Sequence, residues 1–193
     1  MFIPDREDIV RVMKEKGYAF FEKGCNNLNI IGIRNDQLIT NAFDDTLCCI
    51  YRNVNGWVTR YWRITTDPGR YYAEHPCNDN GTAVLVPGQY RGAFTIGRHK
   101  GQYKALVQYK PVTVYRDSNK DHKIDAGRTE TGMFGINIHK AGRKSVQVDR
   151  WSAGCQVFAV EKDFNDFMQI CEYSAVLYGP VFTYTLLERK DFE

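Results

Sequence analysis

Two β-prone runs joined by Asn55-Gly56 constrain the fold more than any other feature of this sequence. The runs, TLCCIYRNV and WVTRYWRITT, occupy residues 46–54 and 57–66. Because Asn-Gly tolerates the positive φ angles of a tight type I′ turn, this stretch predicts a β-hairpin. Cys48 and Cys49 are neighbours on the first strand, so we expect one thiol to face the core and the other to face away.

Helical spacing is found near both ends of the chain. The apolar positions are Ile9, Val10 and Met13 in residues 5–16, and Phe164, Phe167, Met168 and Cys171 in residues 161–175. Gly17 ends the first pattern, so we predict a short N-terminal helix and one long C-terminal helix. The other strand-like stretches are residues 27–35, 82–90, 92–97, 105–116, 133–139, 155–160 and 181–189.

These elements predict a mainly β fold in one domain, residues 1–193. Residues 1–80 supply the N-terminal helix and hairpin, and residues 81–193 supply the remaining strands and the C-terminal helix. Aromatic residues make up 13% of the chain, which suits a β-rich protein. The net charge of +3 is too small to indicate a nucleic-acid partner, and no window is apolar enough for a membrane span.

The six cysteines do not form a recognisable disulfide or zinc pattern. They are Cys25, Cys48, Cys49, Cys77, Cys155 and Cys171. The spacing is irregular, two of them are adjacent, and no C-x-x-C pair is present. Because the chain also begins without a signal peptide, we expect reduced thiols.

A histidine and a cysteine suggest one reactive site. A cysteine nucleophile needs a base, freedom from crowding and donors that face the developing oxyanion. His139 ends an apolar run, and Cys155 follows in a Ser-Ala-Gly-Cys turn. The N–H groups around Gly154 and Cys155 could face a substrate carbonyl, and Ser152 could bond within the turn or to the substrate. A backbone carbonyl or Asp149 could orient His139; the alternative is a buried strand followed by an ordinary loop.

Strand-Ile-His-x-x-Gly followed by Ser-x-Gly-Cys resembles the active-site signature of the YkuD-type L,D-transpeptidases. The likeness covers roughly residues 85–160, including the Pro-Gly segment VPGQYRGAFTIG. It implies an L,D-transpeptidase-like β-sandwich, to which the periodicity adds the two helices. It further implies that Cys155 attacks peptidoglycan stem peptides after an L-residue, with His139 as base and with Ser152 and Gly154 shaping the oxyanion site. The acyl group then passes to an amine or to water.

Two positions depart from that family's pattern. Ala153 stands where histidine is usual, and Val157 stands where arginine or asparagine is frequent. Without that arginine, a substrate carboxylate needs another cation. Arg150 and Arg143 in the connecting loop are candidates, although a solvated basic loop explains them equally well. His75 is a further candidate for the substrate cleft, or else a loop histidine.

An acidic stretch has the ligand spacing of a calcium loop. Oxygen ligands would come from Asp117, Asn119, Asp121 and Asp125, and the Lys123 carbonyl would occupy the seventh position. His122 replaces the usual glycine, and Arg128 replaces the usual glutamate. We predict either a structural Ca²⁺ site or a polar turn held by side-chain-to-backbone bonds.

A zinc hydrolase is the rival enzyme class. Glu74, His75 and Cys77 could contribute ligands, but no H-x-H or H-E-x-x-H pattern is present. We therefore interpret the chain as a cysteine transferase or hydrolase acting on peptidoglycan, made without an export signal and released by another route, as in a bacteriophage or effector. The alternative is a non-enzymatic, calcium-stabilised β domain that binds cell-wall or virion partners.

Overall fold

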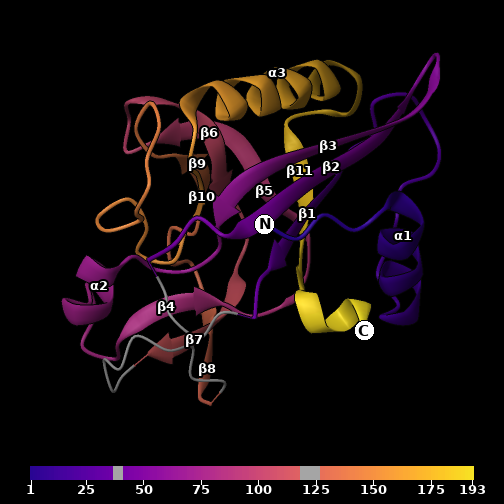
Figure 1. Cartoon of the computed structure of the whole chain (residues 1–193). Coiled ribbons are helices and arrows are strands. Elements are labelled where there is room, and N and C mark those ends of the chain that lie inside the picture. Colours follow the sequence, from indigo (N-terminus) through magenta and orange to yellow (C-terminus); the bar gives the residue numbers. More distant parts are fainter. Residues whose placement is uncertain (37–40, 118–126) are drawn as a thin grey trace.

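The computed structural model describes residues 1–36, 41–117 and 127–193. Within these ranges, eight strands close into a mixed β-barrel in the order β1-β11-β5-β6-β9-β10-β3-β2, which confirms a mainly β fold (Figure 1). Their bounds are β1 Asn29–Arg34, β2 Asp45–Asn53, β3 Gly56–Thr65, β5 Gly88–His99, β6 Tyr103–Gln108, β9 Ile138–Lys140, β10 Gln156–Phe158 and β11 Val181–Glu188. The β1–β11 and β9–β10 pairs are parallel, and the other barrel pairs are antiparallel.

A smaller antiparallel sheet lies at one end of the barrel (Figure 1). It consists of β4 Thr82–Leu85, β7 Val112–Asp117 and β8 Thr129–Gly132. The short helix α2, Arg70–Glu74, connects β3 to β4. Helical periodicity cannot reveal a helix of this length, so the sequence did not predict it.

The barrel combines strands from both halves of the chain. Ile30 of β1 pairs with Tyr184 of β11, and Val157 of β10 pairs with Thr65 of β3. Residues 1–80 and residues 81–193 therefore both contribute strands to the same closed sheet.

The predicted hairpin is confirmed, but its turn is displaced by one residue. Asn53 pairs with Gly56, so the two-residue loop is Val54-Asn55. Of the turn residues, Gly56 takes a positive φ, of 119°, and neither loop residue does. The predicted type I′ turn at Asn55-Gly56 is therefore wrong, because a type I′ turn needs positive φ at both central residues.

Helix α1, Arg6–Glu15, covers the outer face of the β1–β2 region. Asp5 caps it by accepting the Asp8 N–H at 2.8 Å. Ile9 belongs to an apolar cluster that also contains Cys48, whereas Cys49 lies in the barrel core. Both thiols are fully buried, which corrects the expectation that one of them faces away from a core.

The predicted C-terminal helix is confirmed as α3, Glu161–Tyr178, which lies across the top of the barrel in Figure 1. Phe164 and Phe167 are buried, and the Phe167 ring meets Trp62 of β3 edge-to-face with 5.7 Å between centroids. The chain ends in a 3₁₀ helix, η1 Arg189–Phe192. In the described ranges, none of the helices has the length and apolar character needed to cross a membrane.

Candidate active site

Ser152 closes the Ser-Ala-Gly-Cys turn with two hydrogen bonds. Its hydroxyl donates to the Cys155 carbonyl at 2.9 Å and accepts the Gly154 N–H at 3.1 Å. Only 1% of Ser152 is exposed. Of the two positions predicted for this side chain, Ser152 therefore occupies the one inside the turn.

Glycine is required at position 154 by both conformation and space. Gly154 has φ +111°, and an added Cβ would lie 2.0 Å from the Ala83 carbonyl oxygen of β4. Its N–H is already bonded to Ser152, so the expectation that it faces a substrate is wrong. The neighbouring Cys155 N–H has no acceptor among the described residues, so it is free to donate to a bound group.

The Cys155 thiol is half-buried and held between backbone groups. Its Sγ lies 3.4 Å from the Asn137 N–H, which donates to it, and 3.4 Å from the Gly135 carbonyl, which accepts the S–H. Burial raises the pKa of Cys155 to about 11, and the Asn137 N–H and the charge of Lys100 partly offset that effect. The resting side chain is therefore a neutral thiol.

The pairing of β9 with β10 brings His139 and Cys155 to the same face of the barrel wall. His139 lies opposite Val157, and opposed residues share a face. Cys155 precedes β10 and packs against the cluster that contains Val157. Val157 and Ala141 belong to the outer apolar cluster against which Cys155 packs, whereas Ile138 points into the barrel core.

The surroundings of His139 fix which ring nitrogen carries the proton. Nδ1 lies 2.9 Å from the Lys140 carbonyl, which can only accept, so Nδ1 is protonated. Nε2 therefore keeps its lone pair and has no partner among the described residues. Of the two orienting groups proposed from sequence, the backbone carbonyl holds the ring, while Asp149 accepts from Asn41. Burial, with His99 as the next cause, lowers the pKa of His139 to about 3.

A second histidine, which sequence reasoning missed, lies against the first. The rings of His99 and His139 stack with 4.0 Å between centroids. Asn137 donates its Nδ2–H to His99 Nδ1 at 3.1 Å, and its Oδ1 accepts the Gln108 N–H at 2.9 Å. His99 therefore carries its proton on Nε2. His99 ends β5 and reaches the site only through pairing of β5, β6 and β9, so no local pattern could have identified it.

The structure brings together two of the three residues predicted for substrate binding. The Arg150 guanidinium lies 3.9 Å from the Tyr71 ring centroid, and His75 stacks on Tyr71 at 4.8 Å. A cleft of about 530 Å³ adjoins them and is also lined by Trp151. Arg143 lies elsewhere, near Glu161 at the start of α3, whose pKa is lowered chiefly by the hydrogen bond from Lys140 and to a smaller extent by the Arg143 charge.

No group of three His, Cys, Asp or Glu side chains is arranged to hold a metal ion in the ranges that the structure describes. The rival zinc set of Glu74, His75 and Cys77 is therefore not assembled, and His75 stacks on Tyr71. The calcium loop lies outside the described residues, apart from Asp117 at the end of β7.

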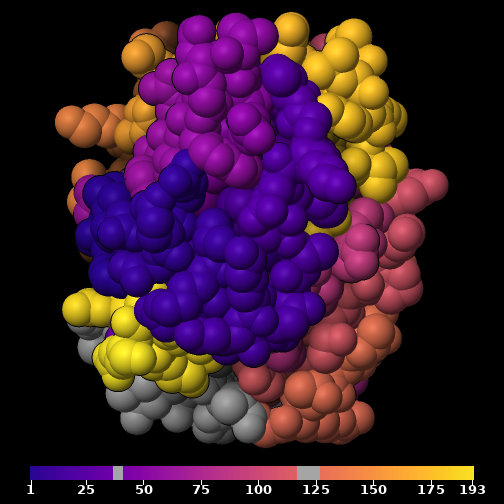
Figure 2. Space-filling model, turned by 90° about the vertical axis from the view of Figure 1, so that its right-hand side faces the viewer, coloured from indigo at the N-terminus to yellow at the C-terminus, as the bar shows by residue number. Residues whose placement is uncertain are grey.

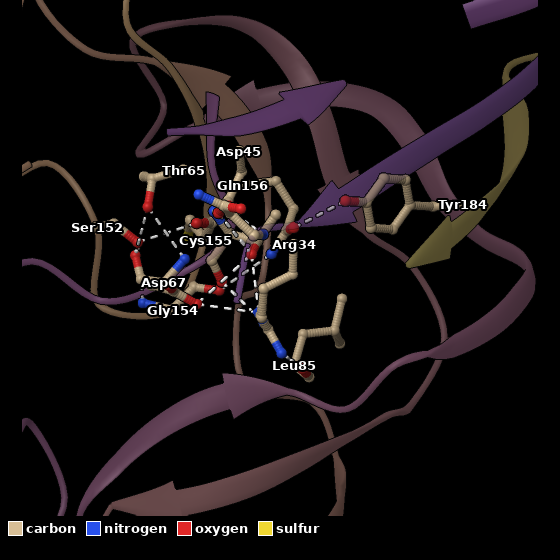
Figure 3. Close-up of polar contacts among 12 residues, drawn as sticks. Arg34, Asp45, Thr65, Asp67, Leu85, Ser152, Gly154, Cys155, Gln156 and Tyr184 are labelled. Atoms are coloured by element: carbon tan, nitrogen blue, oxygen red, sulfur yellow. Dashed lines mark hydrogen bonds and ion pairs between the residues drawn. The ribbon is translucent and has the colours of Figure 1, made fainter. Parts of the chain in front are cut away.

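A buried polar cluster lies next to the Ser152–Cys155 turn (Figure 3). Arg34 pairs with Asp67 at 3.0 Å and donates to the Leu85 carbonyl at 3.0 Å. The Thr66 N–H and hydroxyl both donate to Asp45, at 2.6 and 2.8 Å. Burial, with the Asp67 charge as the next cause, raises the pKa of Asp45 to about 8. The cluster ties barrel strands to β4, the strand against which the cysteine turn packs.

No protein-family model, no curated protein and no solved structure matches this chain. The chain is therefore described by its fold and its candidate site alone. The chain is a mainly β barrel protein with a half-buried thiol, two stacked histidines and an adjoining aromatic cleft.

Proposed function

We propose that this chain is a cysteine-dependent enzyme that cleaves or transfers peptidoglycan stem peptides in the manner of an L,D-transpeptidase. The observation that carries the proposal is the geometry of the β9–β10 pair. His139 lies opposite Val157, against whose cluster Cys155 packs, with the His139 proton held on Nδ1 and the Nε2 lone pair without a partner among the described residues.

The reaction begins when His139 Nε2 takes the thiol proton of Cys155 as Sγ attacks the carbonyl carbon of the L-residue. A C–S bond forms, and the carbonyl oxygen becomes an oxyanion opposite the Cys155 N–H. When the intermediate collapses, the C–N bond breaks and the D-residue leaves as an amine that receives the proton from His139. Water or a second amine then attacks the thioester and regenerates the thiol.

The substrate side of the site is the cleft beside Tyr71. Residues 149–151 line it and lead directly into the turn that holds Cys155. Arg150 supplies the cation that binds a substrate carboxylate. In the family pattern this cation comes from a residue after the cysteine, where this chain has Val157. His75 orders Tyr71 and does not itself line the cleft.

The finer fold belongs to the same proposal. We regard the barrel, with its flanking β4–β7–β8 sheet, as a divergent form of the L,D-transpeptidase catalytic domain. His99 compensates for Ala153 by supplying an Nε2–H donor near the site. The enzyme acts on the bacterial wall after release or delivery, for example during phage infection.

Digestion of muropeptides by the parent protein, with the products identified by mass spectrometry, tests the function. Cys155→Ala should abolish product formation, and His139→Gln should reduce it by about 10²–10⁴-fold, the range for loss of a general base. Cys77→Ala is the matched control, because it removes an exposed thiol away from the turn and should leave turnover unchanged. Equal product from the parent and Cys155→Ala would exclude the thiol mechanism.

A further inference from the structure

A second cavity, of about 400 Å³, lies between α3 and the β2–β3 hairpin. Its walls include Tyr51, Arg60, Trp62, Asp166 and Tyr173. None of these residues belongs to the cysteine turn or to the cleft beside Tyr71. Figure 2 shows the hairpin, the segment before β1 and the end of α3 meeting at the top of the molecule.

The hairpin wall is aromatic and rigid. Trp62 lies opposite Leu47, and Arg60 lies opposite Cys49, so both project from the face that α3 covers. Trp62 is only 7% exposed and contacts Phe167, which fixes its ring. A ring held in this way can contact the apolar face of a ligand without losing conformational entropy on binding.

The helix wall combines polar and apolar groups on one face of α3. Asp166, Ile170 and Tyr173 follow at helical spacing, so their side chains point in one direction. Tyr173 is 60% exposed and stands at the rim. Gln169 adds an amide to the same wall. A cavity with this mixture suits a small polar ligand that also has apolar surface.

The two charged side chains of the cavity, Arg60 and Asp166, can interact with a ligand. Among the residues that the structure describes, neither Arg60 nor Asp166 forms an ion pair with a protein group. Arg60 lies beside Tyr51 in the cavity wall, and the five N–H donors of its guanidinium leave donors for a ligand. One positive and one negative group favour a ligand that has no net charge and offers both donors and acceptors.

We infer that this cavity binds an uncharged N-acetylated amino sugar. The acetamido carbonyl accepts from Arg60, its N–H donates to Asp166, and its methyl group contacts Ile170. The apolar face of the pyranose ring lies on the aromatic wall. This inference goes beyond the proposed function and does not depend on Cys155.

Calorimetric titration with tri-N-acetylchitotriose tests the inference, with cellotriose as the sugar that lacks acetamido groups. The parent should bind the acetylated trimer at least tenfold more tightly than cellotriose. Arg60→Gln and Asp166→Asn should each weaken that binding about 10- to 100-fold, as expected for loss of a charge-assisted hydrogen bond. Arg52→Gln is the matched control, since Arg52 lies over Trp57 on the other face of the hairpin.

The variant Cys155→Ala separates this inference from the proposed function. It should bind the trimer as the parent does, whether or not the parent turns over muropeptides. Absence of binding, equal binding of cellotriose, or unchanged binding by both Arg60→Gln and Asp166→Asn would each overturn the saccharide site. Loss of binding in Cys155→Ala would move the ligand to the cysteine turn and would also overturn it.

Discussion

The ionisation of Cys155 can be tested directly by its rate of alkylation. Burial raises the pKa of this thiol to about 11, compared with an ordinary value of 9.0. At pH 8, the thiolate fraction is then about 10⁻³ in place of about 10⁻¹, a difference of about 2.7 kcal/mol. A thiolate of higher pKa is more nucleophilic, by about eightfold for this shift, so alkylation should be about tenfold slower in the folded protein than in the unfolded chain.

The His139 ring does not change this expectation in the resting protein. With pKa values of about 3 and about 11, full proton transfer from Cys155 to His139 costs about 11 kcal/mol before the attraction between the two charges is counted. A preformed thiolate–imidazolium pair is therefore not populated. Under the proposed mechanism, His139 takes the proton only as the C–S bond forms, as in general base catalysis.

The assay is iodoacetamide labelling of the native protein between pH 6 and 10, with the modified cysteine identified by peptide mass spectrometry. The same labelling in concentrated urea gives the unfolded reference. The rate at Cys155 should rise about tenfold per pH unit over this range without levelling off. His139→Gln should label with the same pH profile. A plateau below pH 8 that disappears in His139→Gln would refute the reasoning, because it would indicate a stable ion pair.

Three further predictions concern stability. Gly154→Ala should lower both the unfolding midpoint and the turnover, because the new methyl group would clash with the Ala83 carbonyl and position 154 has a positive φ. Calorimetry measures the midpoint and the muropeptide assay measures the turnover. An unchanged midpoint would contradict this prediction. Phe167→Ala should cost about 3–5 kcal/mol in urea unfolding, since its ring is fully buried, and a loss below 1 kcal/mol would count against the described core. Asp45 has a higher pKa in the folded state than in the unfolded state, so its contribution to stability is present at acid pH and is lost as pH rises towards 8. Asp45→Asn should therefore flatten the fall in unfolding free energy between pH 5 and 8, and an unaltered slope would rule Asp45 out as its source.

Local chemistry in the sequence was sufficient for the parts of the fold that depend on neighbouring residues. Asp5 and Gly17 bound α1, and apolar spacing located α3. The β-prone runs around residue 55 predicted the hairpin. Its turn was misplaced because the choice between Val54-Asn55 and Asn55-Gly56 depends on strand register, and register is set by which side chains are buried across the whole sheet.

The sequence by itself identified His139 and Cys155 as candidate reactive residues, together with the glycine before the thiol. Only the tertiary structure decided what surrounds them. The stacking of His99 on His139, the burial that makes Cys155 a weak acid, and the contact of Arg150 with Tyr71 all join segments that are far apart in the chain. Pairing over such separations depends on how the barrel closes and excludes water, and periodicity along one segment carries no information about that closure.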